Sequence, residues 1–203
     1  MRVSIILGNP RPGSFCHAIA NTVAAQLAAC GHTTVVHDLQ SEGFDPVITA
    51  DEIETRVSAN PLVEQHCREL ADADGLIVIH PVWWGGPPAI LKGWIDRVVR
   101  RGVAYDVVPN VEDSRMGHVG RLRVQAAIVF NTADTPADLE ESLFRDSIGV
   151  LWKNYIATMC GIPVLERHSF SVMGTSTAEV RREWLGTVSE VVTRLFPANM
   201  RPV

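Results

Sequence analysis

Five strand-like segments, each followed by a helical pattern, constrain the fold more than any other feature of this sequence. The expected strands cover residues 3–7, 33–37, 76–79, 123–130 and 164–173. Between them, apolar residues recur at helical spacing, for example at positions 15, 19, 23 and 27. Chains in which strands and helices alternate form parallel sheets with helices on both faces. We therefore predict an α/β doubly wound sheet of five parallel strands in the order 2-1-3-4-5.

Length and charge narrow the class of protein further. With 203 residues, 46% of them hydrophobic, the chain suits a single domain over 1–203. A net charge of −5 argues against a nucleic-acid partner. The densest basic group is Arg97, Arg100 and Arg101, which we interpret as a solvated helix end. No apolar run suits a signal peptide or a membrane span, so we expect a cytoplasmic protein without membrane insertion.

The four cysteines have no spacing typical of a metal site or a redox motif. They are Cys16, Cys30, Cys67 and Cys160. A disulfide scaffold is implausible at this length, so reduced thiols are expected. His66 shares a helix with Cys67, and we interpret both as packing or surface residues. We expect no metal site.

An aromatic, glycine- and proline-rich loop follows the third expected strand. It begins at Pro81 and continues through Val82, Trp83, Trp84 and Gly85. One interpretation is that both tryptophans pack under the next helix and that the glycines only form a turn. Two adjacent tryptophans followed by Gly-Gly-Pro-Pro favour a ligand loop instead. Such a stiff, aromatic loop suits a flat, partly apolar ring.

The loop after the first strand, residues 8–14, leads into a helix that starts near Ser14. A helix amino terminus offers unpaired N–H groups and a positive dipole end, which stabilise a phosphate. The Ser14 hydroxyl and the Arg11 charge would add to this. The loop has neither a dinucleotide glycine fingerprint nor a Walker sequence, and an ordinary strand-to-helix turn remains the alternative.

The predicted strand order brings these two loops together. The switch point of a 2-1-3-4-5 sheet lies between strands one and three, and both loops follow those strands. Residues 131–134 end the fourth strand beside them. A phosphate loop and an aromatic loop on one crevice favour a flavin site.

At this point the sequence resembles a known family. The run from Pro81 to Tyr105, above all 88–94 and 102–105, is similar to the flavodoxin-like NAD(P)H:quinone oxidoreductases. Residues 44–46, Phe-Asp-Pro, resemble that family's motif after strand two. The resemblance extends from Met1 to about Thr177. It implies a flavodoxin-like fold, bound FMN or FAD, a homodimer, and the activity of an NAD(P)H dehydrogenase (quinone)-like flavoprotein reductase.

The resemblance also implies which residues bind the flavin. The loop at its phosphate corresponds to Asn9, Ser14, Phe15 and Cys16. The loop against its ring corresponds to Pro81, Val82, Trp83, Trp84 and Gly85. The segment at the ring's pyrimidine side corresponds to Asn131, Thr132, Ala133 and Asp134. The short chain and the phosphate loop lead us to expect FMN, with FAD nearly as well supported.

The sequence departs from the family at the expected proton donors. The tyrosine and histidine of the mammalian enzymes fall near Leu139 and Phe144, so no catalytic residue carries over. Asp134 is a candidate donor, although capping of the helix that starts at Thr135 is the favoured role. His80 precedes the aromatic loop on a buried strand, where we expect a core histidine.

The family activity is a two-electron transfer. Hydride passes from NAD(P)H through flavin N5 to a quinone or similar acceptor, and we expect ping-pong kinetics because both substrates use one face. We expect backbone N–H groups of 83–85 and 131–133 to stabilise the anionic reduced ring. The alternatives are an electron carrier, a flavin-dependent regulatory subunit of a transporter, or reduction of azo and nitro compounds.

Overall fold

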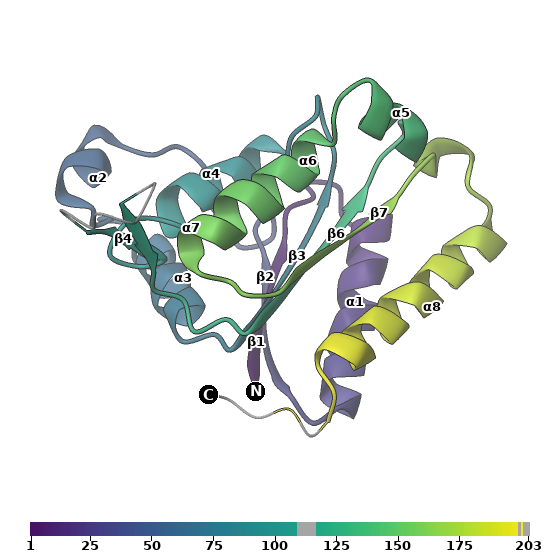
Figure 1. Ribbon diagram of the computed structural model, residues 1–203, viewed down its shortest axis with the longest axis horizontal. Helices are drawn as coiled ribbons and strands as arrows, with labels where there is room; N and C mark the ends of the chain where they lie inside the picture. Colours follow the sequence, from purple (N-terminus) through teal and green to yellow (C-terminus); the bar gives the residue numbers. More distant parts are fainter. Residues whose placement is uncertain (109–116, 199, 201–203) are drawn as a thin grey trace.

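The computed structural model describes residues 1–108, 117–198 and 200. Its main sheet has five parallel strands in the order β2-β1-β3-β6-β7, which confirms the predicted order 2-1-3-4-5. The strands are β1 (Arg2–Leu7), β2 (Thr33–Asp38), β3 (Gly75–Pro81), β6 (Ala126–Thr132) and β7 (Leu165–Phe170). All five carboxyl ends therefore point to one edge of the sheet, which is the upper edge in Figure 1.

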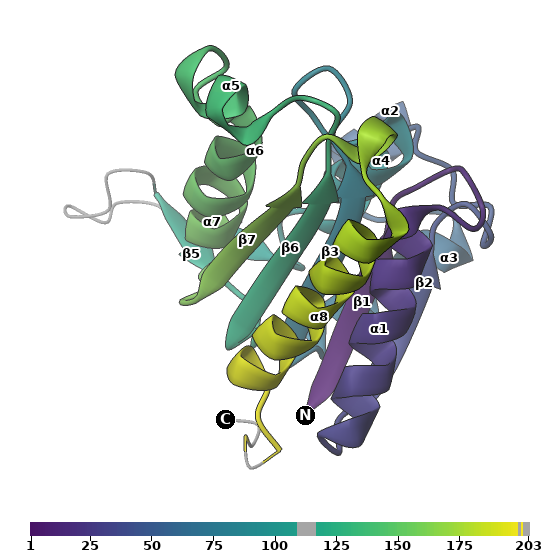
Figure 2. The same ribbon diagram turned by 90° about the vertical axis from the view of Figure 1, so that its right-hand side faces the viewer.

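Helices cover both faces of the sheet, as predicted (Figure 1). One face carries α1 (Phe15–Ala29) and α8 (Ala178–Leu195), which lie side by side in Figure 2. The other face carries α3 (Pro61–Ala71), α4 (Ala89–Val98) and a continuous run of α6 (Ser147–Gly149), the π-helix η1 (Val150–Ala157) and α7 (Thr158–Cys160). Short elements outside these layers are α2 (Ala50–Thr55), α5 (Ala137–Ser142) and the 3₁₀ turn η2 (Met173–Thr175).

The core follows from strands that are buried on both sides. Every residue of β3 and β6 is buried, as expected for central strands of a parallel sheet. Alternate side chains serve the two layers: Ile77 and Ile79 pack toward α1 and α8, whereas Leu76 and Val78 pack toward α3 and α4. The strands that lead to the predicted site loops are therefore anchored by a hydrophobic core on each face.

Several element boundaries differ from the prediction: β6 covers Ala126–Thr132 instead of 123–130, and β7 covers Leu165–Phe170 instead of 164–173. The fourth strand begins at Ala126 rather than 123, because pairing with β3 begins where Gly75 meets Ala126. The segment after Tyr105 is not wholly irregular: β4 (Tyr105–Val107) pairs antiparallel with β5 (His118–Gly120). The part of that prediction that falls on residues 109–116 lies outside the described residues.

The interpretation of the basic group as a solvated helix end is wrong for Arg97. Arg97 is only 3% exposed, and its Nη2 lies 2.6 Å from Oε1 of Glu52. Arg97 also donates to the backbone oxygen of Asp45. Arg100 and Arg101 pair with Glu64 and Asp106. Sequence spacing gave no sign that α2 folds over this end of α4.

Within the described part of the chain, no helix combines the length and the apolar character that a bilayer crossing requires.

Candidate functional site

A cleft of about 500 Å³ opens at the carboxyl ends of β1, β3 and β6, at the switch point between β1 and β3. This is the position where ligands bind in open α/β sheets. Its lining residues are Asn9, Arg11, Gly13, Ser14, Phe15, Cys16, Pro81, Trp83, Thr132, Asp134, Met173, Gly174 and Arg181. The first loop, the aromatic loop and the end of β6 thus meet at one cleft.

Five of the predicted site residues do not line this cleft. Val82, Trp84 and Gly85 line a neighbouring hollow of about 400 Å³ together with Thr135 and Phe144. Asn131 and Ala133 are buried in the wall beneath, where the Asn131 amide donates to Ser169 Oγ at 2.7 Å. The aromatic loop therefore divides two hollows, and a flat ligand beside it can contact both.

The start of α1 has free donors that point to an anion site. Ser14 occupies the N-cap position, but its hydroxyl makes no capping hydrogen bond and lies 2.9 Å from His17 Nδ1 instead. The backbone N–H groups of Phe15 and Cys16 have no backbone acceptor among the residues that the structure describes, and that of Cys16 faces only its own thiol. Unpaired N–H groups at a helix start, with the positive end of the dipole, stabilise a phosphate.

Two arginines add positive charge to the same cleft. Arg11 comes from the first loop, and Arg181 comes from the first turns of α8. Arg181 is held in place because Nε donates to Ser176 Oγ at 2.8 Å and Nη2 donates to the Met173 carbonyl at 3.0 Å. A phosphate in this cleft would meet a helix start and two guanidinium groups.

The aromatic loop is a tight turn with an unusual backbone. Trp83 and Gly86 exchange two backbone hydrogen bonds of 2.9 and 3.0 Å, and Trp84 and Gly85 between them have φ of 51° and 68°. A bulky residue at positive φ costs roughly 1–3 kcal/mol and clusters at functional sites. The turn is held by Ser147, whose hydroxyl donates to the Gly85 carbonyl at 2.7 Å. The Trp84 side chain is fully exposed.

Two of the backbone N–H groups expected to face a ring are already used. Trp83 N–H donates to Gly86, and Ala133 N–H donates to the Phe170 carbonyl at 3.0 Å. Those of Trp84 and Gly85 lack an acceptor in the described part of the chain. The turn, rather than residues 131–133, is therefore the source of free donors beside the ring.

Asp134 does not cap a helix. Its Oδ1 accepts a hydrogen bond from Gly174 N–H at 2.7 Å, and α5 begins after Pro136 without a side-chain cap. The capping prediction was wrong because the chain turns once more before α5 starts. Asp134 instead ties the end of β6 to η2, and both segments border the cleft.

The buried titratable groups beside the cleft are neutral. Burial raises the pKa of the Cys16 thiol, despite hydrogen bonds from Asn9 and Thr132, so it is protonated and a poor nucleophile. Burial lowers the pKa of His80 to about 4. His80 Nδ1–H donates to the Pro81 carbonyl at 2.8 Å, and its Nε2 accepts from Trp152 Nε1–H at 3.1 Å. The expected core histidine is confirmed.

A second group of polar side chains lies away from the cleft, around His66. Ligating atoms of His37, Glu42 and His66 lie within 4.8 Å of one another, a spacing that a metal would accept. However, Trp94 Nε1–H donates to His66 Nδ1 at 3.0 Å, which places the proton of neutral His66 on Nε2. A metal-bound histidine instead donates through its second nitrogen. The group is better described as a hydrogen-bonded core network.

Comparison with known proteins gives the family. The family model described as a flavodoxin-like fold matches residues 1–190. Ribosyldihydronicotinamide dehydrogenase (quinone) of Mus musculus is 30% identical over 210 residues, covering 92% of this chain and 88% of that protein. The chain belongs to the flavodoxin-like NAD(P)H:quinone oxidoreductase family. The resemblance of residues 81–105 is thereby confirmed, as is the expectation of an NAD(P)H dehydrogenase (quinone)-like enzyme.

Solved structures agree with this family. The NAD(P)H:quinone oxidoreductase from Methanothermobacter marburgensis superposes with a TM-score of 0.83 at 25% identity, covering 96% of this chain and 98% of that one. An FMN-dependent NADH-azoreductase from Bacillus anthracis, in complex with FMN, shares the fold with a TM-score of 0.75 at 13% identity; the match covers 96% of this chain and 98% of that one.

Sequence reasoning missed a fourth side of the cleft, formed by Met173, Gly174 and Arg181. Local patterns place Arg181 early in the last helix, but nothing in them shows that this helix start returns to the first loop. The pairing of β7 beside β6 brings it there. Tertiary packing, rather than a local sequence motif, therefore brings the positive charge of Arg181 to the cleft.

Proposed function

We propose that this chain is a flavin-dependent NAD(P)H oxidoreductase that transfers two electrons to a quinone or a similar acceptor. The observation that carries the proposal is the pairing of an anion-binding helix start with a strained aromatic turn at one cleft of the sheet. A flavin has a phosphate at one end and a flat ring at the other. The family membership supports the same activity.

The phosphate end of the ligand would lie at the start of α1. Phe15 N–H, Cys16 N–H and the Ser14 hydroxyl offer hydrogen bonds there. Arg11 and Arg181 would balance the phosphate charge. These residues bind and orient the cofactor, and they take no part in the electron transfer.

The ring would lie along the 81–85 loop. When bound, the flavin supplies the redox chemistry by accepting hydride at N5 and returning two electrons to the acceptor. Trp83 offers an apolar wall to the ring. The N–H groups of Trp84 and Gly85 are fixed dipoles that would stabilise negative charge on the reduced ring.

The acceptor would bind beside Trp84, in the hollow lined by Val82, Thr135 and Phe144. An aromatic, half-open hollow suits a quinone ring. NAD(P)H and the acceptor would use this place in turn, which gives ping-pong kinetics. Asp134 as proton donor stays a weak candidate, since its carboxylate is engaged with Gly174.

We further propose FMN as the cofactor. The cleft of about 500 Å³ places both arginines near the helix start, where a terminal phosphate would lie. FAD would extend beyond this end of the cleft, and extraction of the bound cofactor followed by mass spectrometry distinguishes the two.

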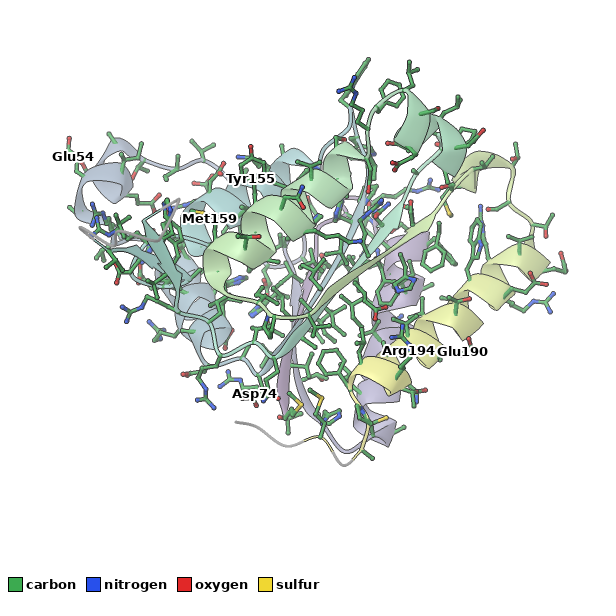
Figure 3. The ribbon with its side chains drawn as sticks, viewed as in Figure 1. Glu54, Asp74, Tyr155, Met159, Glu190 and Arg194 are labelled. Carbon is green, nitrogen blue, oxygen red and sulfur yellow. The ribbon has the colours of Figure 1, made fainter. Side chains whose placement is uncertain are left out.

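A homodimer is part of the proposal. Exposed apolar side chains occur on α6–η1–α7 and on α2, which lie on the same side of the sheet in Figure 1; among them are Val150, Tyr155 and Ile53. Tyr155 is 63% exposed and is labelled in Figure 3. Contiguous exposed apolar surface is typical of interfaces, and we therefore propose the dimer contact on this side. Light scattering of wild-type and Tyr155→Asp protein tests it; a monomeric wild type contradicts it. A cytoplasmic location stays a prediction.

The activity is tested with the flavin-loaded protein. We expect NADH or NADPH to bleach the flavin under anaerobic conditions, and menadione to restore its colour in many rapid turnovers. Initial rates at several fixed menadione concentrations should give parallel double-reciprocal lines. Intersecting lines contradict the shared site, and reduction without reoxidation by menadione would favour the electron carrier.

A further inference from the structure

At the start of α1, three side chains are linked by hydrogen bonds, and the proposed redox function uses only the first of them, Ser14. His17 Nδ1 lies 2.9 Å from Ser14 Oγ, and His17 Nε2 lies 3.3 Å from Asp38 Oδ2. Ser14 lines the cleft, whereas Asp38 is the last residue of β2. The chain therefore links the cleft to a carboxylate on the neighbouring strand.

The protonation state of His17 decides what Ser14 offers to the cleft. With a neutral ring, Nε2–H donates to Asp38, and Nδ1 accepts the Ser14 hydroxyl proton. The hydroxyl then presents only lone pairs to a ligand. With an imidazolium ring, Nδ1–H donates to Ser14 Oγ, and the hydroxyl proton is free to point into the cleft. Only in the second state can the Ser14 hydroxyl donate a hydrogen bond to a phosphate oxygen.

An acidic partner, Asp38, is held beside the His17 ring. Asp38 is fixed by Ser41, whose hydroxyl and backbone N–H donate to it at 2.7 and 3.3 Å. Burial alone would raise the pKa of Asp38, but hydrogen bonds from Ser41 and the His17 interaction outweigh it and lower the pKa. An ionised carboxylate therefore faces the ring.

The other charged groups at the cleft are coupled to His17 through the bound ligand. Arg11 and Arg181 are its cations, and the carboxylate of Asp134 is engaged with Gly174 N–H. Two fixed guanidinium charges disfavour a third cation in an empty cleft but not in one that holds a phosphate dianion. Ligand binding and protonation of His17 therefore support one another.

We propose that Ser14, His17 and Asp38 make phosphate binding proton-coupled: the phosphate group of the ligand binds to the imidazolium form, and one proton passes from solvent to His17 as it docks. The inference rests on the proposed function, because it places the flavin phosphate at the start of α1. It applies to phosphate esters as a class. Riboflavin, which lacks the phosphate, would not contact these three side chains.

The test compares FMN with riboflavin on wild-type and His17→Gln protein between pH 6 and 9. Flavin fluorescence gives the dissociation constants. Above about pH 7 the free phosphate is already a dianion, so its own titration no longer contributes. We expect the wild-type constant for FMN to rise by up to about tenfold per pH unit on the alkaline side. The constant for riboflavin, and that of the variant for FMN, should change little.

Proton uptake is a second readout. Calorimetry in two buffers of different ionisation enthalpy should give uptake of about one proton per FMN for wild-type protein at alkaline pH and about none for His17→Gln. Asp38→Asn removes the carboxylate that favours the imidazolium, so its FMN affinity should begin to fall at a lower pH than that of wild-type protein. Circular dichroism of each variant checks that the fold is kept.

The two proposals fail in different ways. If FMN binds tightly with the same pH dependence in wild-type and His17→Gln protein, proton coupling is wrong and the flavin site stands. If neither FMN nor riboflavin binds, the proposed function itself is wrong and the inference falls with it.

Discussion

Two tryptophans ten residues apart, Trp84 and Trp94, have opposite environments. Trp84 is fully exposed on a turn with positive φ, whereas Trp94 on α4 is 1% exposed and donates from Nε1 to His66. Both belong to the run of residues that carries the family resemblance. One half of that motif therefore borders the candidate site, and the other half is the support that holds it.

The support is built from close packing. A Cβ at Gly93 would overlap the backbone of Pro46, so α4 lies directly on the Phe-Asp-Pro segment. Buried Arg97 fastens the same helix to Glu52. Because α4 cannot shift, the turn that precedes it can keep a strained backbone. Substitutions in α4 should therefore lower mainly the stability, whereas substitutions in the turn should lower mainly the activity.

The largest effect should follow truncation of the buried tryptophan. Trp94→Ala creates a cavity and should lower the free energy of unfolding by about 3–5 kcal/mol in chemical denaturation. Trp94→Phe keeps most of the bulk and loses the bond to His66, so a loss of about 1–2 kcal/mol is expected. If both variants unfold like wild type, α4 is not the support.

Removal of the buried cation Arg97 should have the second-largest effect on stability. Arg97→Met leaves the Glu52 carboxylate buried without its partner and should lower stability by about 3 kcal/mol. The double variant Arg97→Met with Glu52→Gln should recover part of that loss, measured by thermal unfolding. Equal losses in the single and the double variant would mean that the pair is not coupled.

Lowering the pH should destabilise the support of α4 through one group, His66. Burial, with the nearby His37, lowers the pKa of His66 to about 3 in the folded chain, against about 6.5 when unfolded. The unfolded chain therefore takes up the proton first, and stability that is complete above pH 6.5 falls as the pH is lowered toward 3. At pH 5 the loss should be about 2 kcal/mol. His66→Gln should show a stability profile that is flatter by this amount; an unchanged slope would contradict it.

The exposed tryptophan should affect stability least. Trp84→Ala should change the free energy of unfolding by less than about 0.5 kcal/mol, and Trp84→Gly should raise it by up to about 1 kcal/mol, because glycine tolerates positive φ. Both should lower kcat/KM for menadione by about tenfold, the loss of roughly 1.4 kcal/mol of binding to the transition state. A Trp84 variant that is destabilised but fully active would contradict the contrast between Trp84 and Trp94.

Local patterns predicted the parts of this molecule that depend on local sequence. The strand order follows from five alternating elements, and the loops of the cleft follow from Ser14 at a helix start and from the tryptophans after β3. The failures at the cleft and its support join distant segments. Arg181 lines the same cleft as the first loop, Arg97 pairs with Glu52, and Asp134 bonds to Gly174 instead of to its own helix. Such contacts depend on tertiary packing, which spacing along the chain does not encode.

The central claim is that one cleft holds a flavin between the start of α1 and the turn at Trp84. Anaerobic titration of the FMN-loaded protein with NADPH or NADH, followed by menadione, tests it most directly. We predict that one equivalent of either nucleotide bleaches the bound flavin and that one equivalent of menadione restores it. A protein that binds no flavin, or whose bound flavin neither nucleotide reduces, would contradict the account.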